Sequence, residues 1–98
     1  MDFKSLSVVI PCFNEEKTIA TVIERVSAAD ALGLAIDIVV VDDCSTDGTR
    51  EIIREYESRP GVRVFYEDAP RGKGAAVRVG LENLTGDLVL IQDGDLEY

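Results

Sequence analysis

The chain has 98 residues, a net charge of −9 and 46% hydrophobic residues, a composition typical of one small globular domain. The negative charge argues against nucleic acid as a partner, and a phosphate-bearing ligand would need a cation to offset repulsion. The apolar runs are too short to span a membrane, and residues 1–6 lack the apolar core of a signal peptide. We therefore expect a cytoplasmic protein.

Strands and helices are predicted to alternate along the first half of the chain. An apolar run over Leu6–Ile10 predicts a first strand, which Pro11 ends. Asn14 then suits the N-cap of a helix. A second apolar run predicts a strand over Ile36–Val41. The buried stripe of the intervening helix is predicted to consist of Ile19, Val22, Ile23 and Val26.

The alternation continues in the second half. Capping groups follow the second strand and predict a helix over about Asp47–Glu57. A short third strand is expected over Val62–Tyr66, and a last apolar strand at Leu88–Ile91 ends in two carboxylates. Between them a glycine-containing loop precedes a third helix. The predicted inner faces are Ile52, Ile53 and Tyr56 for the second helix, and Val77, Leu81 and Leu84 for the third.

This β-α-β-α-β-α-β order, with short connections and strands that look buried on both faces, predicts a three-layer α/β fold. Its sheet should be mainly parallel, with right-handed crossovers. In such sheets ligands bind beyond the carboxyl ends of the strands. Polar segments collect at that edge, so we expect the site there. They are Pro11–Glu15, Asp42-Asp43, Arg71–Gly74 and Asp93–Asp95.

The last of these segments, Asp93-Gly94-Asp95, is a candidate metal site. Side chains at i and i+2 of an extended segment share one face, with Cα atoms about 7 Å apart. Carboxylate oxygens so placed suit Mg²⁺ or Mn²⁺, which could bridge to a diphosphate. Glu97 continues the alternation and is either a third ligand or a solvated charge. The alternative interpretation of the whole segment is a surface turn.

Asp42-Asp43 and the loop with Arg71 and Lys73 are candidate ligand-binding residues. Adjacent carboxylates repel unless they are paired, solvated or bound. One could accept hydrogen bonds from a base or ribose while the other braces the loop or caps a helix. Arg71 and Lys73 could assist backbone N–H groups in binding phosphate, although a glycine pair before a helix also suits a plain turn.

Two cysteines, Cys12 and Cys44, follow predicted strands and could be neighbours. A reduced, packed pair is the expected state of a cytosolic chain, with a disulfide or a metal site as alternatives. The sequence contains no histidine, which excludes histidine-dependent catalysis within this chain.

Taken together, the chain resembles the amino-terminal half of family-2 glycosyltransferases with the GT-A fold. The resemblance is closest to the branch that includes polyprenyl-phosphate sugar synthases. It rests on four segments in matching order: SVVIPCFNEEKTI (7–19), VDDCSTDGT (41–49), GKGAAVRVG (72–80) and GDLVLIQDGDLEY (86–98).

The resemblance implies a UDP- or GDP-linked sugar as ligand. It also assigns roles to individual residues. Pro11, Asn14 and Glu15 would line the nucleoside pocket, and Asp42 or Asp43 would meet the base. The metal and the diphosphate would be held by Asp93 and Asp95 with Glu97, and Lys73 and Arg71 would lie near the phosphates.

The family usually inverts the sugar carbon by direct displacement, with a carboxylate base further along the chain. The resemblance therefore implies that residues 1–98 are the donor-binding part of a domain truncated after the D-x-D motif. We expect such a piece to bind nucleotide weakly, to transfer nothing, and to self-associate through an uncovered last strand. The acceptor, a lipid phosphate or a glycan, and any membrane attachment at the cytoplasmic face would involve missing segments.

Two positions depart from the family pattern. Cys44 replaces a common glycine, which would affect the loop if the backbone there has positive φ. Gly94 replaces the usual alanine between the metal carboxylates.

Two other functions remain open at this stage. A phosphatase of the haloacid dehalogenase type would use Asp93 as nucleophile and Asp95 as acid/base. Those enzymes place the pair after the first strand, whereas here it follows the fourth. A receiver-like acidic binding module would be non-enzymatic, but its acidic residues belong with the first strand, whereas Asp42-Asp43 ends the second.

Overall fold

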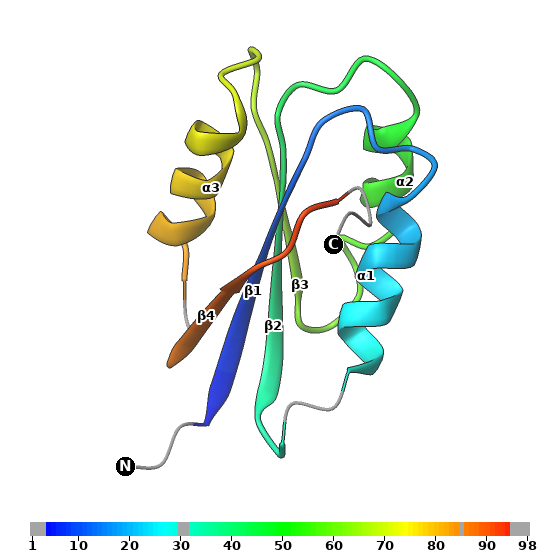
Figure 1. The fold of residues 1–98 in the computed structure, drawn as a ribbon. Helices are drawn as coiled ribbons and strands as arrows, with labels where there is room; N and C mark the ends of the chain where they lie inside the picture. Colours follow the sequence, from blue (N-terminus) through cyan, green and yellow to red (C-terminus); the bar gives the residue numbers. More distant parts are fainter. Residues whose placement is uncertain (1–3, 30–31, 85, 95–98) are drawn as a thin grey trace.

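The computed structural model describes residues 4–29, 32–84 and 86–94. It contains a parallel sheet with the strand order β3-β2-β1-β4 (Figure 1). The strands are β1 (Ser5–Cys12), β2 (Ala35–Asp42), β3 (Val62–Tyr66) and β4 (Leu88–Ile91). β1 and β2 are in register to their ends, where Cys12 lies opposite Asp42, so the loops that follow them leave the sheet at the same level.

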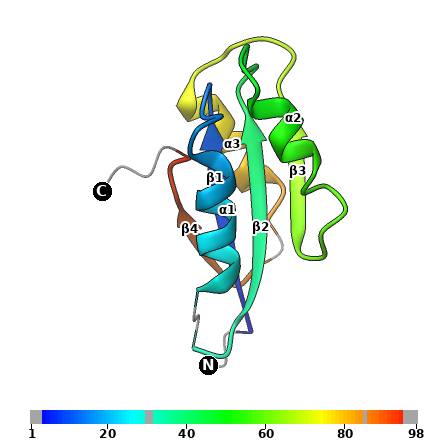
Figure 2. The same ribbon diagram turned by 90° about the vertical axis from the view of Figure 1, so that its right-hand side faces the viewer.

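Within these described ranges, three helices cover the two faces of the sheet. α1 (Ile19–Ala28) and α2 (Thr49–Arg54) lie on one face, and α3 (Lys73–Glu82) lies on the other, as Figures 1 and 2 show from two sides. The predicted three-layer α/β architecture is therefore confirmed. Within the described part of the chain, no helix is long and apolar enough to cross a membrane.

The alternation of side chains along the strands divides the core in two. The larger core lies under α1 and α2, where the predicted residues Ile19, Ile23 and Ile53 are fully buried. They pack on the side chains of β1 and β2 that face them, which are Val8, Ile10, Cys12, Ile38 and Val40. The smaller core, under α3, consists of Val39, Val41 and Ala76 with Phe65 and Val79 at its edge.

The predicted inner face of α3 is wrong. Ala76 and Gly80 are its buried residues, whereas Leu81 is 44% exposed. The cause is close approach to the sheet, because a Cβ on Gly80 would lie 2.4 Å from Cγ1 of Val9. Ala76 and Gly80, four positions apart, line the contact with the sheet. A prediction based on bulky apolar residues therefore places the wrong side of the helix against the sheet.

β4 differs from the other strands. The sequence predicts burial on both faces, but the four side chains of Leu88–Ile91 are 37–51% exposed. In the described part of the chain β4 pairs with β1 alone, and α3 packs on β1 and β2. The expected uncovered apolar edge is therefore present, and self-association through it stays a prediction.

Two predicted helix boundaries are also wrong. α1 begins at Ile19 with Thr18 at its N-cap, so Asn14 is not the cap. Asn14 has φ of +51° and directs its side chain to the loop after β2. α2 spans Thr49–Arg54 instead of about 47–57, although Tyr56, in the turns that follow it, is buried as predicted.

Candidate functional site

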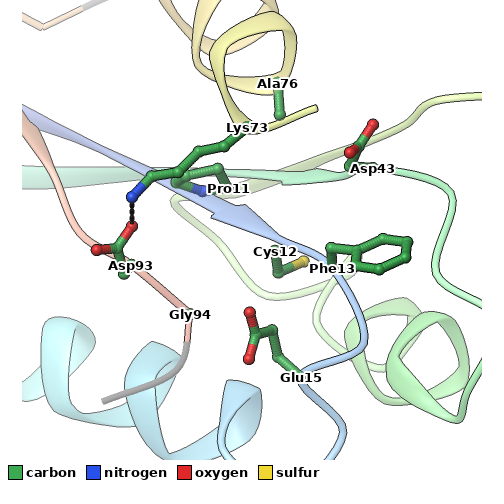
Figure 3. A pocket seen from close by; sticks show the side chains of 9 residues that line it. All are labelled: Pro11, Cys12, Phe13, Glu15, Asp43, Lys73, Ala76, Asp93 and Gly94. Atoms are coloured by element: carbon green, nitrogen blue, oxygen red, sulfur yellow. Dashed lines mark ion pairs between the residues drawn. The ribbon is translucent and has the colours of Figure 1, made fainter. Parts of the chain in front are cut away.

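A pocket opens at the carboxyl end of the sheet, between the N-terminus of α3 and the loops that follow β1 and β4 (Figure 3). Its volume of about 110 Å³ is below the several hundred Å³ of sites that enclose a small molecule, so it would hold part of a larger ligand. The lining residues are Pro11, Cys12, Phe13, Glu15, Asp43, Lys73, Ala76, Asp93 and Gly94.

The structure brings together one or more residues from each of the four polar segments. The predicted site residues that line the pocket are Pro11, Glu15, Asp43, Lys73 and Asp93. Asn14, Asp42 and Arg71 are not among its lining residues. Asp95 and Glu97 lie outside the described residues, so two of the three predicted metal ligands have no placement here.

The two adjacent aspartates have different surroundings. Asp42 is fully buried, with Nε of Arg50 2.5 Å from its Oδ2. The backbone N–H of Ser45 donates to the same carboxylate at 3.0 Å. Arg50 also donates to the carbonyl of Glu67, which ties α2 to the end of β3. Asp42 therefore braces the loop that follows β2 and, through Arg50, the end of β3.

Asp43 faces the pocket and organises the segment before α3. Its side chain is 6% exposed. The N–H of Arg71 donates to one oxygen at 2.8 Å, and the N–H of Gly72 donates to the other at 2.9 Å. Gly72 has φ of +93°, a conformation that glycine adopts readily. These contacts fix the turn from which Lys73 enters α3.

Polar side chains of the DDCSTDGT segment hold the loop after β1, which sequence reasoning missed. The N–H of Asn14 donates to Oγ of Ser45 at 2.9 Å, and the N–H of Glu15 donates to Oγ1 of Thr49 at 2.8 Å. In return, Oδ1 of Asn14 accepts from the N–H of Thr46 at 2.8 Å. The sequence suggested that such side chains cap the helix that follows. In the structure, Ser45 and Thr49 instead connect the segment after β2 to the loop after β1.

Cys12 and Cys44 are not joined by a disulfide in the structure, and their reduced state stays a prediction. Burial raises the pKa of the Cys12 thiol, and the nearby carboxylates of Asp42 and Glu15 raise this pKa further. Cys12 therefore lines the pocket as a buried, protonated thiol. Cys44 has φ of +59°, a left-handed conformation that glycine adopts more readily than cysteine.

The residues after β4 are held by α1 and α3. Lys73 forms an ion pair with Asp93 (Figure 3), and the hydroxyl of Thr18 donates to the carbonyl of Gly94 at 2.6 Å. A Cβ on Gly94 would lie 3.1 Å from Cβ of Cys12, so the glycine fits a narrow space. The Asp93 carboxylate therefore faces a positive charge at the pocket. The described residues contain no cluster of three or more potential metal ligands.

Phe13 is a second residue that sequence reasoning missed. Its side chain is 46% exposed and lines the pocket. Figure 3 shows Phe13 and Asp43 on one side of the pocket and the Lys73–Asp93 pair on the other. The signal available in the sequence was an aromatic residue close behind the first predicted strand, at the edge where ligands are expected to bind.

A parallel α/β sheet whose pocket lies beyond the carboxyl ends of its strands has the arrangement in which open α/β folds bind their ligands. Residues 7–98 match the model of Glycosyl transferase family 2, and the chain belongs to this family. Family membership sets the phosphatase and receiver-like alternatives aside.

A relative from Edwardsiella ictaluri (strain 93-146) is an undecaprenyl-phosphate 4-deoxy-4-formamido-L-arabinose transferase. It is 40% identical over 102 residues, and the match covers 98% of this chain and 31% of the relative. The chain thus spans about a third of that relative's length.

Two solved structures share the fold, which is the expected GT-A fold. The mannosyltransferase PcManGT from Pyrobaculum calidifontis, in complex with GDP-Man and Mn²⁺, has a TM-score of 0.85 and 31% identity, and the match covers 97% of this chain and 28% of that one. S. aureus TarS, in complex with UDP-GlcNAc, has a TM-score of 0.82 and 33% identity over 93% of this chain and 26% of that one.

Proposed function

We propose that residues 1–98 form the donor-binding part of a glycosyltransferase, which binds a UDP- or GDP-linked sugar at this pocket. The observation that carries the proposal is the convergence of Phe13, Asp43, Lys73 and Asp93 on one cavity at the carboxyl edge of the sheet. The complexes of two structural neighbours with UDP-GlcNAc and with GDP-Man support it.

The side of the pocket with Phe13 and Asp43 suits the nucleoside. An exposed aromatic ring can stack on a base, which contributes about 1–3 kcal/mol per base in proteins that bind single-stranded nucleic acids. Each Asp43 oxygen accepts one backbone N–H, and a carboxylate offers about four acceptor positions. Asp43 can therefore accept further hydrogen bonds from a base or ribose, with Pro11 and Glu15 as neighbouring walls.

The side with Lys73 and Asp93 suits the diphosphate. Lys73 would bind phosphate oxygens, with Arg71 as a further cation on the same loop. Asp93 would hold Mg²⁺ or Mn²⁺ together with Asp95 and Glu97. Such a cation would neutralise charge on the leaving diphosphate, which matters in a chain with a net charge of −9. The Mn²⁺ in the PcManGT complex supports this assignment.

The transfer step itself would require the remaining length found in relatives. We propose inversion at the sugar carbon by direct displacement, with a carboxylate base outside residues 1–98. A polyprenyl phosphate is the proposed acceptor, because the relative reported above transfers a sugar to undecaprenyl phosphate, and a glycan is the alternative. Such an acceptor would place the reaction at the cytoplasmic face of a membrane.

Calorimetric titration tests donor binding. UDP, GDP and their sugars are titrated into the 98-residue chain with and without Mn²⁺. We expect weak binding of one nucleotide series, strengthened by Mn²⁺, and no sugar transfer. The absence of binding for all ligands in both conditions would contradict the proposal.

A further inference from the structure

The Lys73–Asp93 ion pair connects the first residue of α3 to the segment after β4. Both side chains remain accessible, with 62% of Lys73 and 39% of Asp93 exposed. Ion pairs with this degree of exposure are weak, because water and dissolved ions compete for both partners. The contact is therefore easily exchanged for another one.

The surroundings of the two residues favour the pair in the absence of ligand. Lys73 stands at the N-terminus of α3, where the helix dipole disfavours a positive charge. Asp93 shares the pocket with two other carboxylates, Glu15 and Asp43, which disfavour a further negative charge. Each partner offsets an unfavourable charge on the other, so Lys73 acts as the counter-ion of Asp93.

We infer that Lys73 competes with a divalent cation for Asp93, and that a nucleotide diphosphate relieves this competition by drawing the ammonium to its phosphates. The inference rests on the proposed function for its second half. By linkage, nucleotide and cation then bind with positive coupling, since each favours the arrangement in which Lys73 has left Asp93. Lys73 is thus a positioning residue that couples the two ligands.

Mn²⁺ affinity without nucleotide tests the competition directly. Calorimetry or Mn²⁺ spin resonance is applied to the wild-type chain, Lys73→Met and Lys73→Arg. We expect Lys73→Met to bind Mn²⁺ about two- to five-fold more tightly, the factor that corresponds to an exposed ion pair. Lys73→Arg keeps the charge and should bind as the wild type does. Because Lys73 is mostly exposed, Met in its place should leave the thermal transition unchanged.

Arg78→Met is the matched control, because it removes a positive charge from an exposed position of the same helix. We expect it to leave Mn²⁺ affinity near the wild-type value. Equal tightening in Arg78→Met and Lys73→Met would assign the effect to net charge and overturn the inference. Equal or weaker Mn²⁺ binding by Lys73→Met, or no Mn²⁺ binding by either protein, would also overturn it.

Saturating UDP or GDP supplies the second readout, with correction for Mn²⁺ held by free nucleotide. The nucleotide should raise Mn²⁺ affinity by a larger factor in the wild type than in Lys73→Met. An identical factor in both proteins would contradict the coupling role. If neither nucleotide binds, the proposed function fails, while the nucleotide-free comparison still decides whether Lys73 competes for Asp93.

Discussion

The loops around the pocket differ in how firmly the protein itself holds them. On the α2 side, Asp42 is fully buried and bonded to Arg50 and Ser45, and Arg50 lies 5.4 Å from the centre of the Tyr66 ring. On the α3 side, Lys73 and Asp93 meet through one accessible ion pair. The contacts of Asp42 hold the loops on the α2 side without a ligand. The ion pair on the α3 side is accessible, so a charged ligand can replace either partner.

The largest effect should come from breaking the rigid side. Asp42→Ala leaves the guanidinium of Arg50, which is 26% exposed, without its carboxylate and removes the acceptor for Ser45. We expect the free energy of unfolding, measured by urea denaturation, to fall by about 3 kcal/mol.

Asp68→Ala is the control for this comparison. It breaks an ion pair with Arg71 at 3.3 Å, in which Asp68 is 91% exposed, and should cost less than about 0.5 kcal/mol. A similar loss in the two variants would show that the buried contacts of Asp42 are no stronger than a surface pair.

The close approach of α3 to β1 should give the next largest effect. In Gly80→Ala the new methyl group would meet Cγ1 of Val9 at 2.4 Å, and we expect a loss of about 1–3 kcal/mol in unfolding free energy. Val9→Ala in the same chain should recover part of it, since the clash is removed. Gly74→Ala, on the same helix with open space around it, should be neutral or slightly stabilising. Equal losses in both glycine variants would refute the close contact.

The nucleoside side of the pocket is tested by Phe13→Ala. Loss of stacking should weaken nucleotide binding by about 1–3 kcal/mol, measured by calorimetry, with little change in the thermal transition because the ring is 46% exposed. Leu81→Ala removes an apolar side chain of similar exposure (44%) from α3 and should leave affinity unchanged. Unaltered affinity in Phe13→Ala would remove this residue from the site.

The smallest effect concerns a surface contact between α1 and the segment after α2. Arg59 donates to both oxygens of Glu24 at 2.8 and 2.9 Å, and these bonds lower the pKa of Glu24 below its usual 4.5. The stabilisation is therefore fully present above pH 4.5 and is lost as the pH falls through the lowered pKa. Urea denaturation should show a small advantage of wild type over Glu24→Gln at neutral pH that shrinks in acid. Arg59→Gln should reduce the same pH dependence and leave the smaller part due to the hydroxyl of Tyr56, which donates to Oε2 of Glu24 at 3.0 Å. A pH-independent difference would contradict this origin.

The sequence was sufficient to predict the fold and the edge of the sheet at which the pocket opens. Apolar runs and helical periodicity predict the alternating elements, and the rule for parallel sheets collects Glu15, Asp43, Lys73 and Asp93 at one edge. The sequence did not predict which residues of α3 face the sheet. The close approach of α3 to β1 requires small residues there, and Ala76 and Gly80 add little to a hydrophobic pattern.

The roles of polar side chains were equally hard to predict. Ser45 and Thr49 bond to a loop that lies some thirty residues earlier in the chain, and local pattern cannot distinguish such a contact from a helix cap. Asp42 and Asp43 have different roles because Arg50 forms an ion pair with Asp42. No sequence motif indicates that Arg50 is important. Long-range polar contacts are therefore the part that required coordinates.

The most direct test of the central claim is a backbone amide NMR titration of the 98-residue chain with UDP or GDP in the presence of Mg²⁺. If the pocket binds the nucleotide, the largest shift changes will fall on Phe13, Asp43, Gly72, Lys73 and Gly94. The amides of Gly61 and Gly86, which precede β3 and β4 at the opposite end of the sheet, will change little. Shift changes centred on Gly61 and Gly86, or no changes at all, would contradict the account.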